Sequence, residues 1–189
     1  MALTVIGGAL KGKRLILPKS GKVRPTSGLV REAVFNILMN EVEDTVVLDV
    51  FAGSGALGIE ALSRGARAAV FVENDPEAIH TIEQNIRSCG LTDSAKLLRQ
   101  NAVQSLSILG TAGLMFDLVL MDPPYKANAL YATLENLGAC GALRPGAIVV
   151  AEHPLKPPVD EDACADIGFK LADRRKYGKT LVYFFNYMV

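Results

Sequence analysis

The stretch VVLDVFAGSGALG, residues 46–58, decides how the rest of the chain can fold. Residues 46–50 are aliphatic except for Asp49, and they do not alternate strictly, which is typical of a strand buried on both faces of a parallel sheet. Gly53, Gly55 and Gly58 follow, and they allow the backbone to turn sharply and to lie close to a ligand. Such a turn after the first strand of an open α/β sheet is where nucleotide-like ligands bind.

The glycine spacing leaves two ligands open. Residues 53–58, GSGALG, fit the dinucleotide pattern G-x-G-x-x-G, and Glu73 lies 20 residues beyond Gly53. Asp49, however, would repel a pyrophosphate and attract the ammonium and sulfonium charges of S-adenosylmethionine. Glu73 could accept hydrogen bonds from the ribose of that donor. The stretch therefore favours a methyl donor, and a nicotinamide dinucleotide is the alternative.

Length and composition indicate one main soluble globular domain. The chain has 189 residues, of which 50% are hydrophobic and 21% are charged. No apolar run reaches the roughly 20 residues of a membrane helix, and the first residues lack a signal-peptide apolar region, so we expect a cytoplasmic protein with no membrane partner. Cys89, Cys140 and Cys164 show no C-x-x-C spacing, and no metal site or disulfide framework is expected.

The charge is unevenly distributed although its formal sum is zero. Residues 1–31 carry seven basic side chains and no acid, and residues 169–189 carry five basic side chains and one acid. The middle, residues 32–168, carries 8 basic against 19 acidic side chains. Basic ends on an acidic body favour a polyanionic partner, and an ordinary solvated surface is the alternative.

The residues before the glycine stretch predict an extension, 1–44, in front of a methyltransferase-like domain, 45–189. Residues 2–16 indicate two short strands joined by glycines, and residues 19–25 a basic loop. A helix is expected to begin at Thr26 or Ser27. Its predicted buried side holds Val30, Val34, Ile37 and Leu38, with Arg31 and Glu32 pointing away from it.

The residues after the stretch predict a doubly wound, Rossmann-like α/β fold. Helices are expected over 56–64, 75–90 and 129–137, and strands over 69–73, 95–98, 116–121 and 147–152. Residues 169–175 and 181–187 predict a closing antiparallel hairpin, which gives a sheet of seven mostly parallel strands together with the N-terminal hairpin and helix. The strands at 46–50 and 116–121 are expected to be neighbours at the topological switch point.

Asp122-Pro123-Pro124-Tyr125 follows the strand at 116–121 and suits transfer to an exocyclic amine. The lone pair of such an amine is delocalised into the base, so the site must hold and polarise it. The Asp122 carboxylate and the Pro123 carbonyl could accept its two N–H groups and direct the lone pair toward a methyl group. Tyr125 offers a flat face for stacking the base. The alternative is a rigid loop capped by an acid.

The two motifs together, DVFAGSGALG (49–58) and DPPY (122–125), resemble the amino-group branch of the S-adenosylmethionine-dependent methyltransferases. The elements IGG, KGKRL, RPT, VRE and FNIL within residues 6–38, GALGIEALSRGA (55–66) and KYG (176–178) narrow the resemblance. They are similar to the RsmD-type guanine-N2 methyltransferases of bacterial small-subunit ribosomal RNA, from about residue 5 to 184.

The resemblance implies S-adenosyl-L-methionine as cofactor and small-subunit (16S) ribosomal RNA, or the assembled small ribosomal subunit, as partner. The expected catalytic residues are Asp122, Pro123, Pro124 and Tyr125. The expected cofactor-binding residues are Asp49, Phe51, Ala52, Gly53, Ser54, Gly55, Glu73, Asn74, Asn101 and Ala102. The resemblance and the basic charge at the ends of the chain together predict a set of RNA-binding residues: Lys11, Lys13, Arg14, Lys22, Arg24, Thr26 and Arg31. Asn101 stands where the family pattern has an aspartate.

Three other functions remain open. A DNA adenine-N6 or cytosine-N4 methyltransferase would use the same chemistry at residues 122–125, although the chain has little length for a separate target-recognition region. A nicotinamide-dependent oxidoreductase fits the glycine spacing. An RNA-binding module without activity fits the basic N-terminal residues alone and leaves residues 122–125 unexplained.

Overall fold

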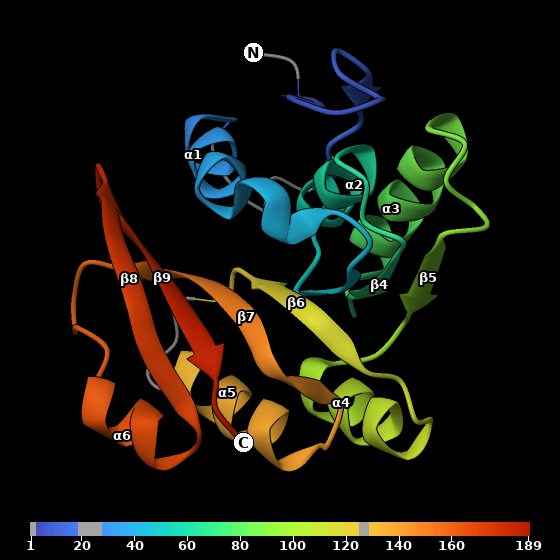
Figure 1. The fold of residues 1–189 in the computed structure, drawn as a ribbon. Helices are drawn as coiled ribbons and strands as arrows, with labels where there is room; N and C mark the ends of the chain where they lie inside the picture. Colours follow the sequence, from blue (N-terminus) through green and yellow to red (C-terminus); the bar gives the residue numbers. More distant parts are fainter. Residues whose placement is uncertain (1–2, 19–27, 125–128) are drawn as a thin grey trace.

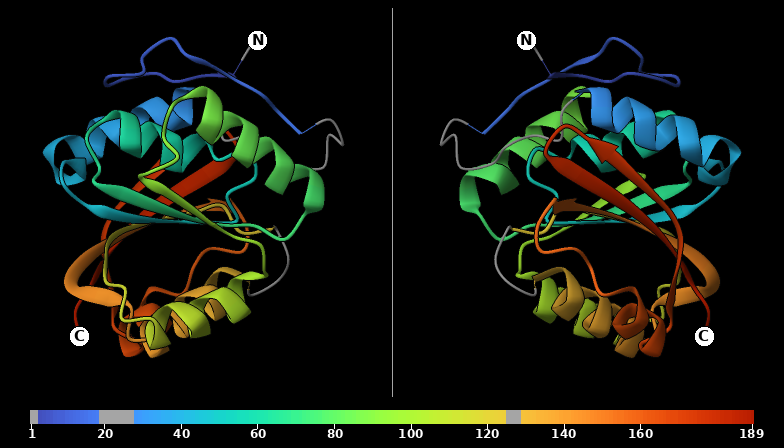
Figure 2. Two further views of the ribbon diagram at one scale, coloured as in Figure 1. Left: turned by 90° about the vertical axis from the view of Figure 1, so that its right-hand side faces the viewer. Right: turned by 90° about the vertical axis from the view of Figure 1, so that its left-hand side faces the viewer.

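The computed structural model describes residues 3–18, 28–124 and 129–189, and in these ranges seven strands form one sheet between two layers of helices (Figures 1 and 2). The strands are β3 (Val46–Val50), β4 (Ala68–Val72), β5 (Ala95–Leu98), β6 (Phe116–Met121), β7 (Leu143–Pro154), β8 (Phe169–Tyr177) and β9 (Thr180–Tyr187). Their order is β5-β4-β3-β6-β7-β9-β8.

The strand directions confirm the predicted doubly wound fold. β3 pairs in parallel with β4 on one side and with β6 on the other, so the strands expected at the switch point are neighbours. β7 continues the parallel set beside β6, and β9 is antiparallel to both β7 and β8. The predicted closing hairpin is therefore present at one edge of the sheet.

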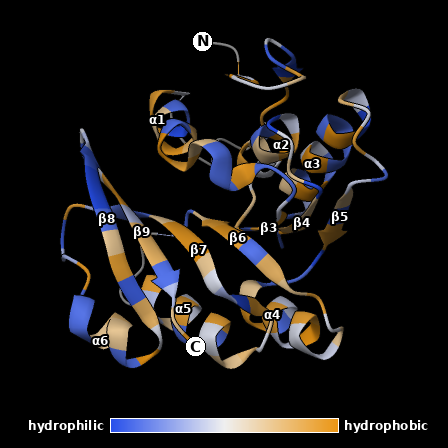
Figure 3. Cartoon of the chain, in the orientation of Figure 1, coloured by the Kyte–Doolittle hydropathy of each residue, from blue (hydrophilic) through white to orange (hydrophobic). Residues whose placement is uncertain are grey.

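Alternate residues of the strands belong to two apolar clusters, one on each face of the sheet. Val47 and Phe71 face α1 (Gly28–Leu38), α2 (Ala56–Ser63) and α3 (Pro76–Ser88). Leu48 and Val70 face α4 (Ala102–Thr111), α5 (Ala129–Ala139) and α6 (Glu161–Asp166). Figure 3 shows the hydrophobic colours of the central strands that these helices cover. Both faces are buried because the crossover helices of a parallel sheet lie on both sides.

Two helices, α4 and α6, lie on segments for which no element is predicted. Each begins at a polar cap: Asn101 Oδ1 accepts the Gln104 N–H at 3.0 Å, and Asp160 Oδ1 accepts the Ala163 N–H at 3.1 Å. α6 has only six residues, too few to show a helical period. Within the described ranges, none of the helices combines the length and the apolar character that crossing a membrane requires.

The predicted N-terminal strands are present as β1 (Leu3–Thr4) and β2 (Arg14–Leu15), which pair antiparallel. They lie over α2 and α3 (Figure 1). Val5 and Leu15 join the same apolar cluster as the face of the sheet below them. The division of the chain at residues 44 and 45 stays a prediction.

The prediction that Arg31 points away from the buried side of α1 is wrong. The buried residues of α1 are Val30, Arg31, Val34, Phe35 and Leu38, so the buried stripe is rotated toward Arg31 and away from Ile37, which is 38% exposed. Arg31 is 2% exposed, and its guanidinium donates to the Thr4 carbonyl and forms an ion pair with Glu60 at 3.6 Å. A helix of period 3.6 can carry an arginine on its buried face when a buried acid compensates the charge.

Glu60 is the acid that makes this burial possible. It is 0% exposed, and its carboxylate accepts the backbone N–H groups of Ile6 and Gly7, both at 2.8 Å. It also accepts the Arg64 Nε–H at 2.8 Å. One side chain of α2 therefore links the segment after β1, α1 and its own helix.

Replacing Glu60 with glutamine should lower the free energy of unfolding by about 3 kcal/mol, because it leaves Arg31 buried without a counter-charge. Chemical denaturation would measure the loss. Glu32→Gln is the matched control, since Glu32 is exposed on α1 and its change should stay within about 0.5 kcal/mol. Equal losses in the two variants would contradict this role for Glu60.

Candidate functional site

The glycine turn lies at the carboxyl end of β3, as the sequence predicts, and it requires unusual backbone conformations. Gly53 and Gly55 have φ of 57° and 76°, in the left-handed region that favours glycine. Phe51 adopts φ of 65°, which a bulky residue rarely does. The Ala52 N–H donates to the Val72 carbonyl at 3.0 Å, which ties the turn to the end of β4. This hydrogen bond therefore fixes the position of the turn relative to β4.

Asp49 lies beneath the turn. It is 1% exposed, and its Oδ2 accepts the Gly58 N–H at 2.9 Å, which fixes the first turn of α2. A Cβ on Gly58 would lie 2.4 Å from Phe71 Cε1 and 3.1 Å from Asp49 Oδ2. The third glycine of the motif is thus required for the close packing of α2 on β4.

Glu73 joins the ends of β3 and β4. One carboxylate oxygen accepts the Gly53 N–H at 2.9 Å, and the other accepts the N–H groups of Asn74 and Asp75 at 2.8 and 2.9 Å. Asp75 in turn caps α3 by accepting from Glu77 and Ala78. The acid predicted to bind a ribose therefore also fixes the shape of both loops.

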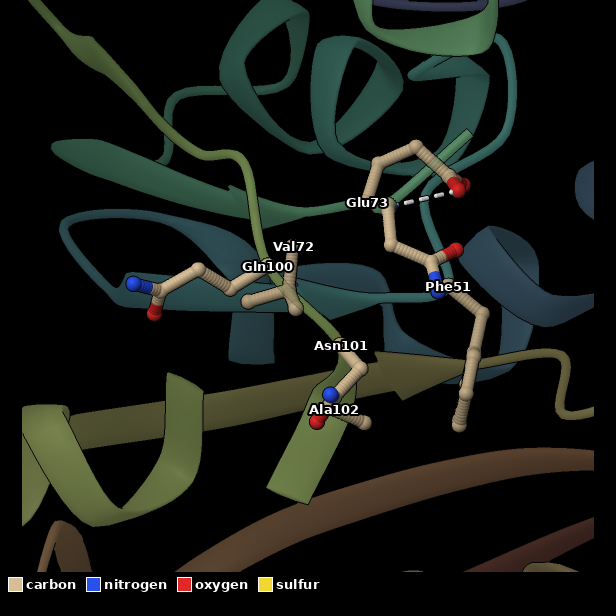
Figure 4. Close-up of a pocket in the computed structure, with 7 residues that line it drawn as sticks. Phe51, Val72, Glu73, Gln100, Asn101 and Ala102 are labelled. Carbon is tan, nitrogen blue, oxygen red and sulfur yellow. Dashed lines mark hydrogen bonds between the residues drawn. The ribbon is translucent and has the colours of Figure 1, made fainter. Parts of the chain in front are cut away.

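A pocket opens beside Glu73, at the carboxyl ends of β4 and β5 (Figure 4). It is lined by Phe51, Val72, Glu73, Asn74, Gln100, Asn101 and Ala102. Phe51 and Glu73 lie on one side, and the Gln100 side chain extends away from them. Phe51, Glu73, Asn74, Asn101 and Ala102 are predicted donor-binding residues, so the structure brings these five to one place. Val72 and Gln100 were not predicted, although both sit where a parallel strand ends.

Asp122 lies on the same edge of the sheet, because Val50 of β3 is level with Met121 of β6. Burial raises the pKa of Asp122 to about 6. Burial also raises the pKa of Asp49 to about 7, and the nearby charges of Glu73 and Asp122 add to that rise while the Gly58 N–H opposes it. Three carboxyl groups thus interact at one edge, an arrangement that favours a positively charged ligand.

Asn85 is a further residue of this region that the sequence analysis did not identify. It is 0% exposed on α3, and its Nδ2 donates to the carbonyls of Ser54 at 2.9 Å and Ile16 at 3.0 Å. Its Oδ1 accepts the Ile16 N–H at 2.8 Å. The glycine turn and the N-terminal extension therefore share one buried amide. An asparagine inside an amphipathic helix gives no local signal of such a role.

The predicted RNA-binding residues that the structure describes are in or next to the N-terminal hairpin, and one of them, Arg31, is 2% exposed and donates to the Thr4 carbonyl. Lys11, Lys13 and Arg14 are exposed. Their hairpin turn lies at the last residue of α2, where the Ala9 N–H donates to the Ser63 carbonyl at 2.7 Å. That end of α2 is near the amino end of β3, because Gly65 accepts the Asp44 N–H. Lys22, Arg24 and Thr26 lie outside the described residues, as does Tyr125 of the predicted catalytic set.

Comparison with known proteins finds relatives over nearly the whole chain. The family model described as Conserved hypothetical protein 95 matches residues 3–186. Ribosomal RNA small subunit methyltransferase D of Escherichia coli (strain K12) is 32% identical over 188 residues, which cover 94% of this chain and 93% of that protein. The protein of the same name from Haemophilus influenzae is 31% identical over 156 residues, which cover 82% of this chain and 80% of that protein.

A solved structure also matches this chain over nearly its whole length. A hypothetical protein of Thermus thermophilus, TTHA0928, superposes with a TM-score of 0.81 at 32% identity, covering 96% of this chain and 98% of that one. The match includes the N-terminal extension as well as the sheet, because so little of either chain is left out.

Proposed function

This chain belongs to the family of the ribosomal RNA small subunit methyltransferase D proteins, and we propose that it transfers a methyl group from S-adenosylmethionine to the N2 amine of a guanine in small-subunit ribosomal RNA. The family and the names of its members support an S-adenosylmethionine-dependent ribosomal RNA methyltransferase. The choice of guanine N2 rests on the chemistry of residues 122–125 and on the sequence resemblance.

The observation that carries the proposal is the meeting of two motifs at one edge of the sheet. β3 and β6 are neighbours, so the glycine turn and Asp122-Pro123 lie beside each other although more than 60 residues separate them in the chain. A donor above the turn and an acceptor beside Asp122 would face each other across this edge. Ligands of open α/β sheets bind at such a switch point.

The residues present fit the methyl donor. When bound, S-adenosylmethionine supplies an electrophilic methyl group on a positively charged sulfur. Asp49, Glu73 and Asp122 bring three carboxyl groups together at this edge; burial is the main cause of the raised pKa of Asp49, and the charges of Glu73 and Asp122 add to it. Phe51, Asn101 and Ala102 line the pocket in which an adenine ring would lie, and Glu73, which also lines it, would accept from the ribose hydroxyls. Asn101 Oδ1 also caps α4, which sets the orientation of its amide.

Asp122 and Pro123 would act on the acceptor. The Asp122 carboxylate and the Pro123 carbonyl accept the two N–H groups of the guanine amine, so its lone pair points toward the donor. The new N–C bond forms as the S–C bond breaks, and the S–C electron pair stays on sulfur. The nitrogen then loses one proton to water. Pro123 and Pro124 keep the loop fixed, because proline restricts φ.

Transfer of a labelled methyl group to undermethylated small ribosomal subunits tests the proposal. Naked ribosomal RNA and duplex DNA are assayed alongside, and the modified nucleoside is identified. We expect N2-methylguanosine in subunits or RNA. Label found only in DNA, as N6-methyladenine or N4-methylcytosine, would overturn the proposed substrate.

Replacing Asp122 with alanine should lower kcat by a factor on the order of 100, with a much smaller change in the affinity for S-adenosylmethionine, because the carboxylate orients the acceptor. Single-turnover kinetics and calorimetric titration measure the two quantities. Asp166→Ala, which removes an exposed acid at the end of α6, is the control. Equal losses of turnover and donor affinity would reject the orienting role.

Donor affinity should fall several-fold as the pH drops from about 8 to 5.5, because the carboxylate of Asp49, whose pKa is raised to about 7, becomes protonated over this range. A cationic ligand binds best to ionised carboxylates, so protonating them weakens binding. S-adenosylhomocysteine, whose sulfur is neutral, should show a shallower dependence in the same titration. Identical pH profiles for the two ligands would contradict this electrostatic account.

A further inference from the structure

The last residues of β8 and the turn that leads to β9 carry exposed cations. Arg174, Arg175, Lys176 and Lys179 are all exposed. Arg174 is paired with Glu161 at 3.1 Å and Arg175 with Asp173 at 2.8 Å. Within the described part of the chain, no ion pair is seen for Lys176 or Lys179. Figure 3 shows the corresponding end of β8 in hydrophilic colours. Two lysines thus remain available to an anionic partner.

The strand register places these lysines at the ligand edge of the sheet. Ala151 of β7 is level with Met121, the residue before Asp122. Three residues further along β7, Pro154 is level with Thr180, which pairs with Tyr177. The β8–β9 turn therefore projects past the carboxyl end of β6. Three strand spacings of about 4.8 Å separate β6 from β8, so the turn lies roughly 14 Å to the side of Asp122.

The turn is held in place by packing. The register of β8 shifts between Leu171 and Asp173, which is the mark of a β-bulge. Leu171 packs with the cluster on the α4–α6 face, whereas Tyr177 packs with the cluster on the α1–α3 face. The aromatic ring anchors the turn next to Lys176 and Lys179. A fixed cationic turn loses less entropy on binding than a mobile loop does.

Protection of an exposed sheet edge does not account for both lysines. Lysines on edge strands prevent pairing with other chains, and Lys170 of β8 suits that role. Lys179, however, lies in the turn, between the last paired residues Tyr177 and Thr180. The lysines of the N-terminal hairpin, Lys11 and Lys13, lie toward the amino end of the sheet instead. The β8–β9 turn is therefore the better placed of the two basic groups to reach nucleic acid at Asp122.

We propose that Lys176 and Lys179 bind phosphates of the ribosomal RNA that flank the target nucleotide. This inference rests on the proposed function, since RNA is the partner expected there. With about 10 Å along the strand added to the roughly 14 Å across the sheet, the turn lies roughly 17 Å from Asp122, within reach of a few nucleotides of one extended strand. The turn would thus hold the backbone of the same strand while the target base lies at Asp122.

The double substitution Lys176→Ala and Lys179→Ala tests the proposal. Its affinity for undermethylated small ribosomal subunits is measured by filter binding between about 50 and 200 mM salt. We expect affinity to fall on the order of tenfold at the lower salt. The slope of log affinity against log salt should become shallower by about 1.5, because each lost phosphate contact removes roughly 0.7 to 0.9. The melting temperature and the affinity for S-adenosylmethionine should not change.

The matched control is the double substitution Lys96→Ala and Lys170→Ala, which removes the same charge from β5 and from the other end of β8. Its slope should equal that of the wild type. If the Lys176/Lys179 variant shows the wild-type slope of log affinity against log salt and normal methyl transfer, the proposed phosphate contacts are wrong. The proposed reaction would be unaffected by that result. A wild-type protein that neither binds nor methylates ribosomal RNA would overturn both.

Discussion

The site depends on two carboxylates, the buried Asp49 and the half-buried Glu73, that accept backbone N–H groups at the ends of parallel strands. Asp49 fixes the start of α2 through Gly58, and Glu73 fixes the glycine turn through Gly53 while it also holds Asn74. These bonds satisfy donors that a tight turn leaves without partners. They also leave negative charge beneath the pocket. The interaction that shapes the loops is therefore the one that makes the site suitable for a cation.

The sequence predicts this part of the molecule well because its signals are local. An apolar run, an acid and three glycines define β3 and its turn within residues 46–58, and an acid before two prolines marks the end of β6. Parallel strands then bring the two motifs together by a general rule of topology. Pattern and topology predict the ligand edge, and the family resemblance adds the individual residues, five of which line one pocket.

The features that sequence reasoning missed depend on contacts between distant segments. Arg31 reads as a surface residue of an amphipathic helix until Glu60, 29 residues away, supplies its counter-charge. Asn85 gives no sign that it binds both Ile16 and Ser54. Asn101 reads as a ligand contact, yet it is also the cap of a helix that the pattern of residues 102–111 does not reveal. Polar groups that act across the fold are not visible in local periodicity.

The burial of Glu60 also limits how this protein can be rebuilt. Its carboxylate lies under the N-terminal extension and contacts Arg31 and the backbone of Ile6 and Gly7. Removing the extension would expose Glu60 to water and would leave Arg64 as its remaining partner among the contacts described. The N-terminal extension therefore cannot be exchanged without changing buried contacts of α2. A chimaera that redirects the enzyme to another RNA must either reproduce these contacts or replace Glu60 with an apolar residue.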